Sequence, residues 1–118
     1  MARELTLHPD RLFPSDHTIR AIARELYHTV RDLPIVSPHG HTDPAWFAQN
    51  DSFGNATDLL LVPDHYVFRM LYSQGVALED LGVGNPGVDP RAAWRLFAER
   101  YHLFRGTPSR MWLDWVFA

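Results

Sequence analysis

The feature that most constrains the fold is a single strand-like run in a chain whose other segments favour helices. Residues 33–37, Leu-Pro-Ile-Val-Ser, carry two β-branched side chains beside a proline, and the run is too short for a helix. This composition predicts a buried strand over about residues 34–38. A single strand cannot satisfy its own backbone hydrogen bonds. We therefore expect either that the chain is part of a longer protein or that the strand pairs with another subunit.

The rest of the chain predicts short helices separated by nine prolines and seven glycines. Apolar side chains at helical spacing and capping residues locate them. The expected segments are helices over about 16–31 (with Ser15 as N-cap), 43–48 and 63–73, and a turn that begins at Asn55 or Thr57. After a loop over 81–90, we expect a helix capped by Asp89, with Ala93, Trp94, Phe97, Tyr101 and Phe104 at helical spacing, and a last helix from Thr107. The last helix ends in aromatic side chains without Gly, Lys or Arg, which also favours a longer protein.

Composition excludes several classes of function. The 118 residues include 11 Lys and Arg against 14 Asp and Glu, a net charge of −3 without any basic run, so we expect no nucleic-acid partner. The absence of Cys excludes disulfide scaffolds and thiolate zinc sites, which leaves His and carboxylates as metal ligands. No apolar run reaches membrane-spanning length, and the charged N-terminus lacks an export signal. We expect a soluble cytoplasmic protein with no membrane partner.

The sequence His39-Gly40-His41 directly follows the predicted strand. In an extended segment both imidazoles point the same way and can bind one cation, for which zinc or iron is suited. Seven histidines in 118 residues give roughly 0.4 such triplets by chance, so the spacing alone is weak. Its place after a strand strengthens it, because barrel enzymes have their active sites at the carboxyl ends of strands. The alternative is a pair of loop histidines that hydrogen-bond to backbone.

Asp43 and Tyr66 each allow two interpretations. Asp43 can orient a metal-binding histidine, but the following Pro44 favours helix capping. Tyr66 and Arg69 are three residues apart on a predicted helix, and a phenol beside a guanidinium can transfer protons. Alternatively, Tyr66 packs against Met70 at the edge of a core. The tryptophans at positions 94, 112 and 115 indicate a core or a subunit contact.

Two longer motifs resemble the N-terminal part of the uronate isomerases, also called glucuronate isomerases. The motifs are PIVSPHGHTDP and, about twenty residues later, PDHYVFRMLYSQGV, and the LHPDRLFP lead adds to the likeness. These enzymes belong to the amidohydrolase superfamily. The resemblance implies the α/β class, with residues 1–118 as the N-terminal part of a distorted (β/α)₈ TIM barrel: a first strand at about 34–38 and a helical insertion over about 43–118.

The resemblance also implies a reaction and its residues. The reaction interconverts hexuronates with their keto forms, glucuronate with fructuronate and galacturonate with tagaturonate. His39 and His41 become ligands of a divalent metal, with zinc the first choice, and Tyr66 becomes the catalytic tyrosine. Eight strand and helix units need about 250 residues, so we expect the 118-residue chain alone to be inactive. We expect a hexuronate as the substrate and a homo-oligomer as the assembly.

Two other functions stay open at this point. A metal-dependent amidohydrolase shares the His-x-His after its first strand, although the Tyr66 segment argues against it. A non-catalytic helical module would use the aromatic last helix as a docking surface.

Overall fold

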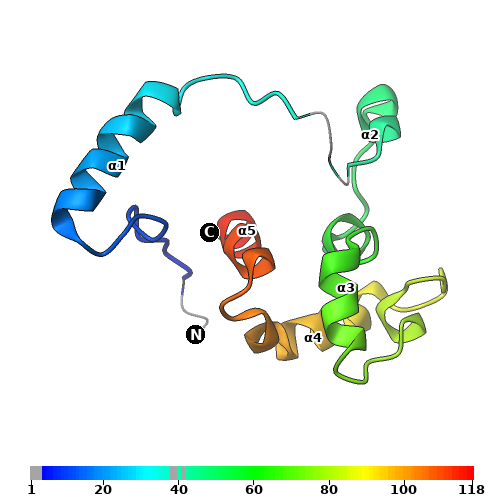
Figure 1. Ribbon diagram of the computed structural model, residues 1–118. Helices are drawn as coiled ribbons and strands as arrows, with labels where there is room; N and C mark the ends of the chain where they lie inside the picture. The colour runs from blue at the N-terminus through cyan, green and yellow to red at the C-terminus, as the bar shows by residue number, and fades with distance from the viewer. Residues whose placement is uncertain (1–3, 38–39, 41) are drawn as a thin grey trace. The chain divides into compact units, whose positions relative to one another are not determined.

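The computed structural model describes residues 4–37, 40 and 42–118. These residues divide into two compact units, Met1–Gly40 with Asp114–Ala118, and His41–Leu113. We call them the N-terminal unit and the helical unit. Every regular element of the described residues is helical (Figure 1). No helix in this described part of the chain is long and apolar enough to cross a membrane.

The N-terminal unit contains helix α1, His17–Val30. Its N-cap is Asp16, whose Oδ1 accepts a hydrogen bond from the backbone N–H of Ile19 at 2.9 Å. The prediction of Ser15 as N-cap is wrong by one residue. A carboxylate at this position gains from the positive end of the helix dipole, whereas a serine hydroxyl carries no charge.

The lead segment of the N-terminal unit is fixed to α1 by polar and aromatic contacts. Arg24 Nε donates a hydrogen bond to Asp10 Oδ1 at 2.8 Å, and this bond holds the pKa of the Asp10 carboxyl below its ordinary value. The Phe13 and Tyr27 rings meet edge to face with centroids 5.9 Å apart. The apolar stripe of α1 is nevertheless more than half exposed along its length, at Ile19, Ile22, Leu26, Tyr27 and Val30.

The predicted strand at about 34–38 is not found. Residues 34–37 have no regular secondary structure, and residue 38 lies outside the described residues. Ile35 is 93% exposed and Val36 is 89% exposed. A strand exists only where a second segment supplies the ladder of hydrogen bonds, and no described residue forms such a ladder here. The expectation of one clear strand was therefore wrong for this structure.

The helical unit is built from short elements. In chain order they are α2 (Pro44–Gln49), the π-helix η1 (Thr57–Leu61), α3 (His65–Tyr72), the 3-10 helix η2 (Glu79–Leu81), α4 (Pro90–Glu99), the 3-10 helix η3 (Tyr101–Phe104) and α5 (Pro108–Phe117). The last turn of α5 belongs to the N-terminal unit. Helix α4 packs against η1, η2 and η3, and it therefore organises this unit.

The core of the helical unit is apolar, with one polar exception. Its buried apolar residues are Leu61, Val67, Leu71, Val76, Leu81, Ala93, Phe97, Phe104 and Leu113. Thr57 is the buried polar residue, and its Oγ1 donates a hydrogen bond to the Pro90 carbonyl oxygen at 2.6 Å. That bond joins the start of η1 to the start of α4. It also satisfies the hydroxyl, which would be costly to bury unpaired.

Local capping explains most helix starts. Asp43 and Asp89 cap α2 and α4, each ahead of a proline, as predicted. The predicted turn at Asn55 or Thr57 is the π-helix η1.

Two helices are shorter than predicted. Helix α3 begins at His65 rather than Pro63, because Asp64 is its N-cap. Helix α4 ends at Glu99 rather than continuing to Phe104. The backbone of Arg100 leaves the helical region, at φ −105° and ψ 9°, and the 3-10 turn that follows brings the Phe104 ring within 5.8 Å of Phe97.

Candidate functional site

The candidate site begins at the first turn of α3, where Asp64 fixes the backbone. Asp64 Oδ1 accepts a hydrogen bond from the backbone N–H of Tyr66 at 2.8 Å. This cap places His65 and Tyr66 on the first turn, with their ring centroids 4.4 Å apart and their planes at 33°. The cap keeps the first turn of α3 helical, and His65 and Tyr66 belong to this turn. Capping therefore helps to fix the positions of both rings.

Tyr66 lies at the wall of a pocket. Its side chain is 57% exposed. It lines a cavity of about 480 Å³ together with Pro108, Ser109 and Trp112 from α5. The phenol is therefore accessible to a small molecule in this pocket. The structure does not decide between this interpretation and the alternative in which Tyr66 packs against Met70 at the edge of a core.

A second pocket shares a wall with the first. Its volume is about 240 Å³, and its lining residues are Thr42, Trp46, Leu59, Leu60, Pro63, Asp64 and Trp112. Trp112 lines both pockets. Thr42 directly follows the His-x-His motif, and Asp64 begins the Asp-His-Tyr motif. Thr42 and Asp64, more than twenty residues apart in the chain, therefore line one pocket, and Tyr66 lines the pocket beside it.

The predicted metal ligands His39 and His41 lie outside the described residues. The donor set fits zinc in kind, since imidazole is one of its preferred ligands, but a catalytic zinc site takes three protein ligands and this motif offers two. Among the described residues, no group of three His, Cys, Asp or Glu side chains is arranged to hold a metal ion. Asp43 acts as a helix cap, with its Oδ1 accepting from the Ala45 N–H at 2.9 Å.

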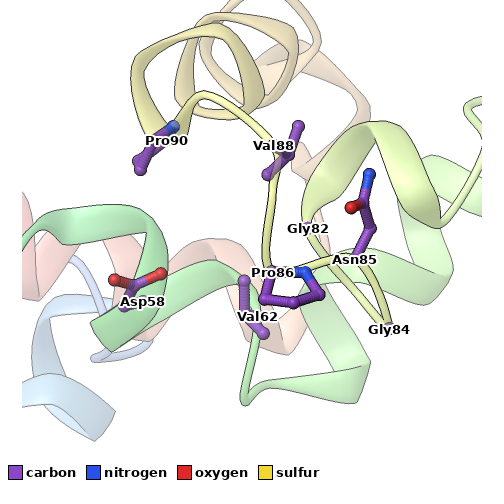
Figure 2. A pocket seen from close by; sticks show the side chains of 8 residues that line it. All are labelled: Asp58, Val62, Gly82, Gly84, Asn85, Pro86, Val88 and Pro90. Atoms are coloured by element: carbon purple, nitrogen blue, oxygen red, sulfur yellow. The ribbon is translucent and has the colours of Figure 1, made fainter.

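A third pocket of about 420 Å³ lies elsewhere in the helical unit (Figure 2). Asp58 of η1 stands on one side, and the loop that carries Pro86 and Val88 stands opposite. The Asp58 carboxylate already has a partner, because Asn55 Nδ2 donates to its Oδ2 at 2.6 Å. Apart from this hydrogen-bonded carboxylate, the walls of the pocket are mostly apolar. The pocket therefore has fewer side chains that could take part in catalysis than the pocket of Tyr66.

Comparisons with known proteins identify the family. The sequence pattern of glucuronate isomerases matches residues 13–116. The chain belongs to the glucuronate isomerase family. The uronate isomerases of Sphingopyxis alaskensis and Rhizorhabdus wittichii are 73% identical to it over 118 residues and 71% identical over 116 residues. The crystal structure of glucuronate isomerase from Caulobacter crescentus matches 98% of this chain with a TM-score of 0.91 and 62% sequence identity.

The chain spans about a quarter of the length of the curated relatives it matches, 25% for both uronate isomerases named above. It likewise covers 25% of the Caulobacter crescentus chain. Family membership confirms the resemblance drawn from the two motifs. The roles of His39, His41 and Tyr66 stay predictions.

Sequence reasoning missed Trp112 as a pocket residue and assigned it to a core or a subunit contact. Trp112 is half-buried and separates the pocket of Tyr66 from the pocket of Thr42. The only sequence signal was its distance from the start of the last helix, because Trp112 follows Pro108 by four residues. That spacing places the two on one helix face but does not tell which segment they meet.

Proposed function

We propose that this chain takes part in uronate isomerisation, with a hexuronate such as glucuronate or galacturonate as substrate. The observation that carries the proposal is the exposure of Tyr66 at a pocket that shares Trp112 with the pocket of Thr42 and Asp64. The names of the two uronate isomerases reported above support the same reaction.

The reaction moves one hydrogen between neighbouring carbons of the sugar acid. A proton leaves C2 and a proton arrives at C1, while the proton of the C2 hydroxyl is exchanged for one on the C1 oxygen. The aldehyde thereby becomes an alcohol and the C2 alcohol becomes a ketone, through an enediol. Such transfers need a side chain within hydrogen-bond reach of the reacting group. We assign this role to the Tyr66 hydroxyl, which gives up and takes back a proton at the sugar oxygens.

His39 and His41 are proposed to hold a divalent metal, with zinc the first choice because of their imidazole donors. When bound, such a metal polarises substrate oxygens and stabilises negative charge on them. The third protein ligand has to come from outside the two-histidine motif. Within this chain, Asp64 keeps the first turn of α3 in place, and Trp112 separates the two pockets.

The proposed fold of the full enzyme is a distorted (β/α)₈ barrel of the amidohydrolase type. In it, residues 34–38 would form the first strand, with partners supplied by the rest of the barrel. Because such a barrel needs about 250 residues, the 118-residue chain alone is expected to be inactive. Location in the cytoplasm and a homo-oligomeric assembly stay predictions.

The test is an exchange protein, in which this chain replaces the matching quarter of the Sphingopyxis alaskensis uronate isomerase. We expect the exchange protein to isomerise glucuronate or galacturonate. The control is the same relative without that quarter, which should be inactive although the remaining three quarters are unchanged. A folded exchange protein that turns over neither uronate would refute the proposal, and a panel of hydrolase substrates would then be the next assay.

Metal is tested separately on the same protein. Metal content measured by elemental analysis should fall in the His39→Ala and His41→Ala variants relative to His28→Ala, a histidine of α1. Unchanged metal content in all three variants would exclude the assigned ligands.

A further inference from the structure

Helix α4 has a second face that takes no part in the core. Ala93 and Phe97 are buried against the rest of the helical unit. Arg91, Arg95 and Ala98 are exposed and, with the half-buried Trp94, lie on a neighbouring face of the same helix. This second face lines a groove of about 430 Å³, whose opposite wall is the segment Asn55, Ala56 and Thr57. The volume lies within the range of sites for small molecules.

The groove has a fixed frame. Thr57 is 2% exposed, and its hydroxyl donates to the Pro90 carbonyl oxygen at 2.6 Å, which locks the two walls together at one end. On the wall opposite α4, Asn55 is held by Asp58: its Nδ2 donates to the Asp58 carboxylate, and its Oδ1 accepts a hydrogen bond from the Asp58 N–H at 3.0 Å. The groove is therefore preformed, so a ligand would not have to order it.

The charge in the groove is positive and has no partner within the described residues. Arg91 and Arg95 are four residues apart on one helix face, a spacing at which like charges destabilise a helix. Ion pairs among the described residues use Arg24, Arg31 and Arg100, and neither groove arginine takes part. The residues that line the groove include no acidic side chain, and Asp58, which follows Thr57 in the chain, is held by Asn55. An anion between the two guanidinium groups would relieve their repulsion.

Trp94 gives the groove a flat apolar surface beside these charges. Its ring lies 5.0 Å from that of Phe97, with the planes at 51°, and Phe97 is buried in the core. The indole is thereby held in one position, and a large rigid ring surface contributes contact area at little cost in side-chain entropy.

From this arrangement we propose that the α4 groove binds a small ring compound that carries a carboxylate. The arginine forks match the geometry of a carboxylate, and the indole supports the ring. The groove is distinct from the pocket of Tyr66 and shares no lining residue with it. The choice of a hexuronate as the natural ligand rests on the proposed function. The binding of a ring compound with a carboxylate does not depend on that function.

The test is a titration of the ¹⁵N-labelled 118-residue chain with glucuronate, followed by the indole N–H signal of Trp94. That signal is assigned by its loss in a Trp94→Phe sample. We expect a saturable shift with glucuronate and at least a tenfold weaker response to glucose, which lacks the carboxylate, and to acetate, which lacks the ring. The double variant Arg91→Gln/Arg95→Gln should bind glucuronate at least tenfold more weakly. The control variant Arg31→Gln, in an exposed ion pair of the N-terminal unit, should bind it as before.

Absence of a saturable shift, or equal affinity in the groove variant and the control, would overturn the inference. Failure here is separate from failure of the proposed function, because the exchange protein is tested by turnover and the groove by binding. An active exchange protein with no glucuronate binding at Trp94 overturns only the groove. An inactive exchange protein with glucuronate bound at Trp94 overturns only the assigned reaction.

Discussion

Gly82 occupies a position where the structure leaves no room for a side chain. Its φ is 85°, in the left-handed region, and it ends the 3-10 helix η2. A β-carbon there would lie 2.9 Å from Val88 Cγ1 and 3.3 Å from Val62 Cγ2. Gly84, two residues on in the same loop (Figure 2), has φ 75° and no heavy atom within 4 Å of such a β-carbon. The two glycines thus share a backbone cost, and only Gly82 adds a steric one.

The magnitudes follow from these two costs. An alanine in the left-handed region is destabilised by roughly 1–2 kcal/mol, and overpacking adds about 1–3 kcal/mol. We expect Gly84→Ala to lower the free energy of unfolding by about 1–2 kcal/mol. We expect Gly82→Ala to lower it by about 2–5 kcal/mol. Each change also lowers the conformational entropy of the unfolded chain by the same amount. This contribution therefore cancels when the losses of Gly82→Ala and Gly84→Ala are compared.

The assay is urea unfolding followed by far-ultraviolet circular dichroism, with the slopes of the transitions compared to confirm that the same surface unfolds. The double variant Gly82→Ala/Val88→Ala provides the matched control, because it removes the nearer of the two side-chain atoms that the new β-carbon would meet. Its loss should exceed that of Val88→Ala alone by about as much as Gly84→Ala costs. Equal losses for Gly82→Ala and Gly84→Ala would refute the steric argument.

Three further predictions concern stability. Thr57→Val keeps the shape of the side chain but removes the hydroxyl that donates to the Pro90 carbonyl oxygen, so the free energy of unfolding should fall by about 0.5–1.5 kcal/mol, whereas Thr57→Ser keeps the hydrogen bond and should lose less. Phe104→Ala empties a fully buried site and should cost about 3–5 kcal/mol in the same urea assay, and a loss below about 1 kcal/mol would contradict its core position. Asp10→Asn removes the negative charge that faces Arg24 but keeps an oxygen that can accept its hydrogen bond. Because the folded-state pKa of Asp10 is lowered, its contribution is present above its ordinary pKa and is lost as the pH falls through the folded-state value. The difference between Asp10→Asn and the natural chain in urea unfolding should therefore be constant near neutral pH and disappear in acid, and a constant difference down to strong acid would disprove the role of the charge.

The starts of α2 and α4 were predicted correctly because capping is local, whereas the caps of α1 and α3 were each placed wrongly by one or two residues. An Asp directly before a Pro identifies a start from two adjacent residues, as at Asp43 and Asp89. The end of α4 was predicted less well. Apolar residues at helical spacing continue through Tyr101 and Phe104. In the structure a 3-10 turn, rather than a longer α-helix, brings both rings against Phe97, and apolar spacing does not distinguish these two backbone conformations.

The strand-like run shows the limit of composition. Ile35 and Val36 have the side chains of a buried strand, yet a strand also depends on a partner segment, which no residue property of the run reveals. The candidate site divides in the same way. Tyr66 could be named as a candidate because its motif is local, whereas Trp112 was missed because its pocket joins segments more than forty residues apart. The groove of Arg91 and Arg95 needed the fold for the same reason.

The most direct test of the central claim is the rate of glucuronate isomerisation by the exchange protein in two matched variants of α3. Tyr66→Phe removes the hydroxyl assigned to proton transfer, and Tyr72→Phe removes an equally exposed hydroxyl at the other end of the helix. The account predicts that kcat falls by about 10²-fold or more in Tyr66→Phe and stays within a few-fold in Tyr72→Phe. Full turnover by Tyr66→Phe, with the protein folded, would contradict it.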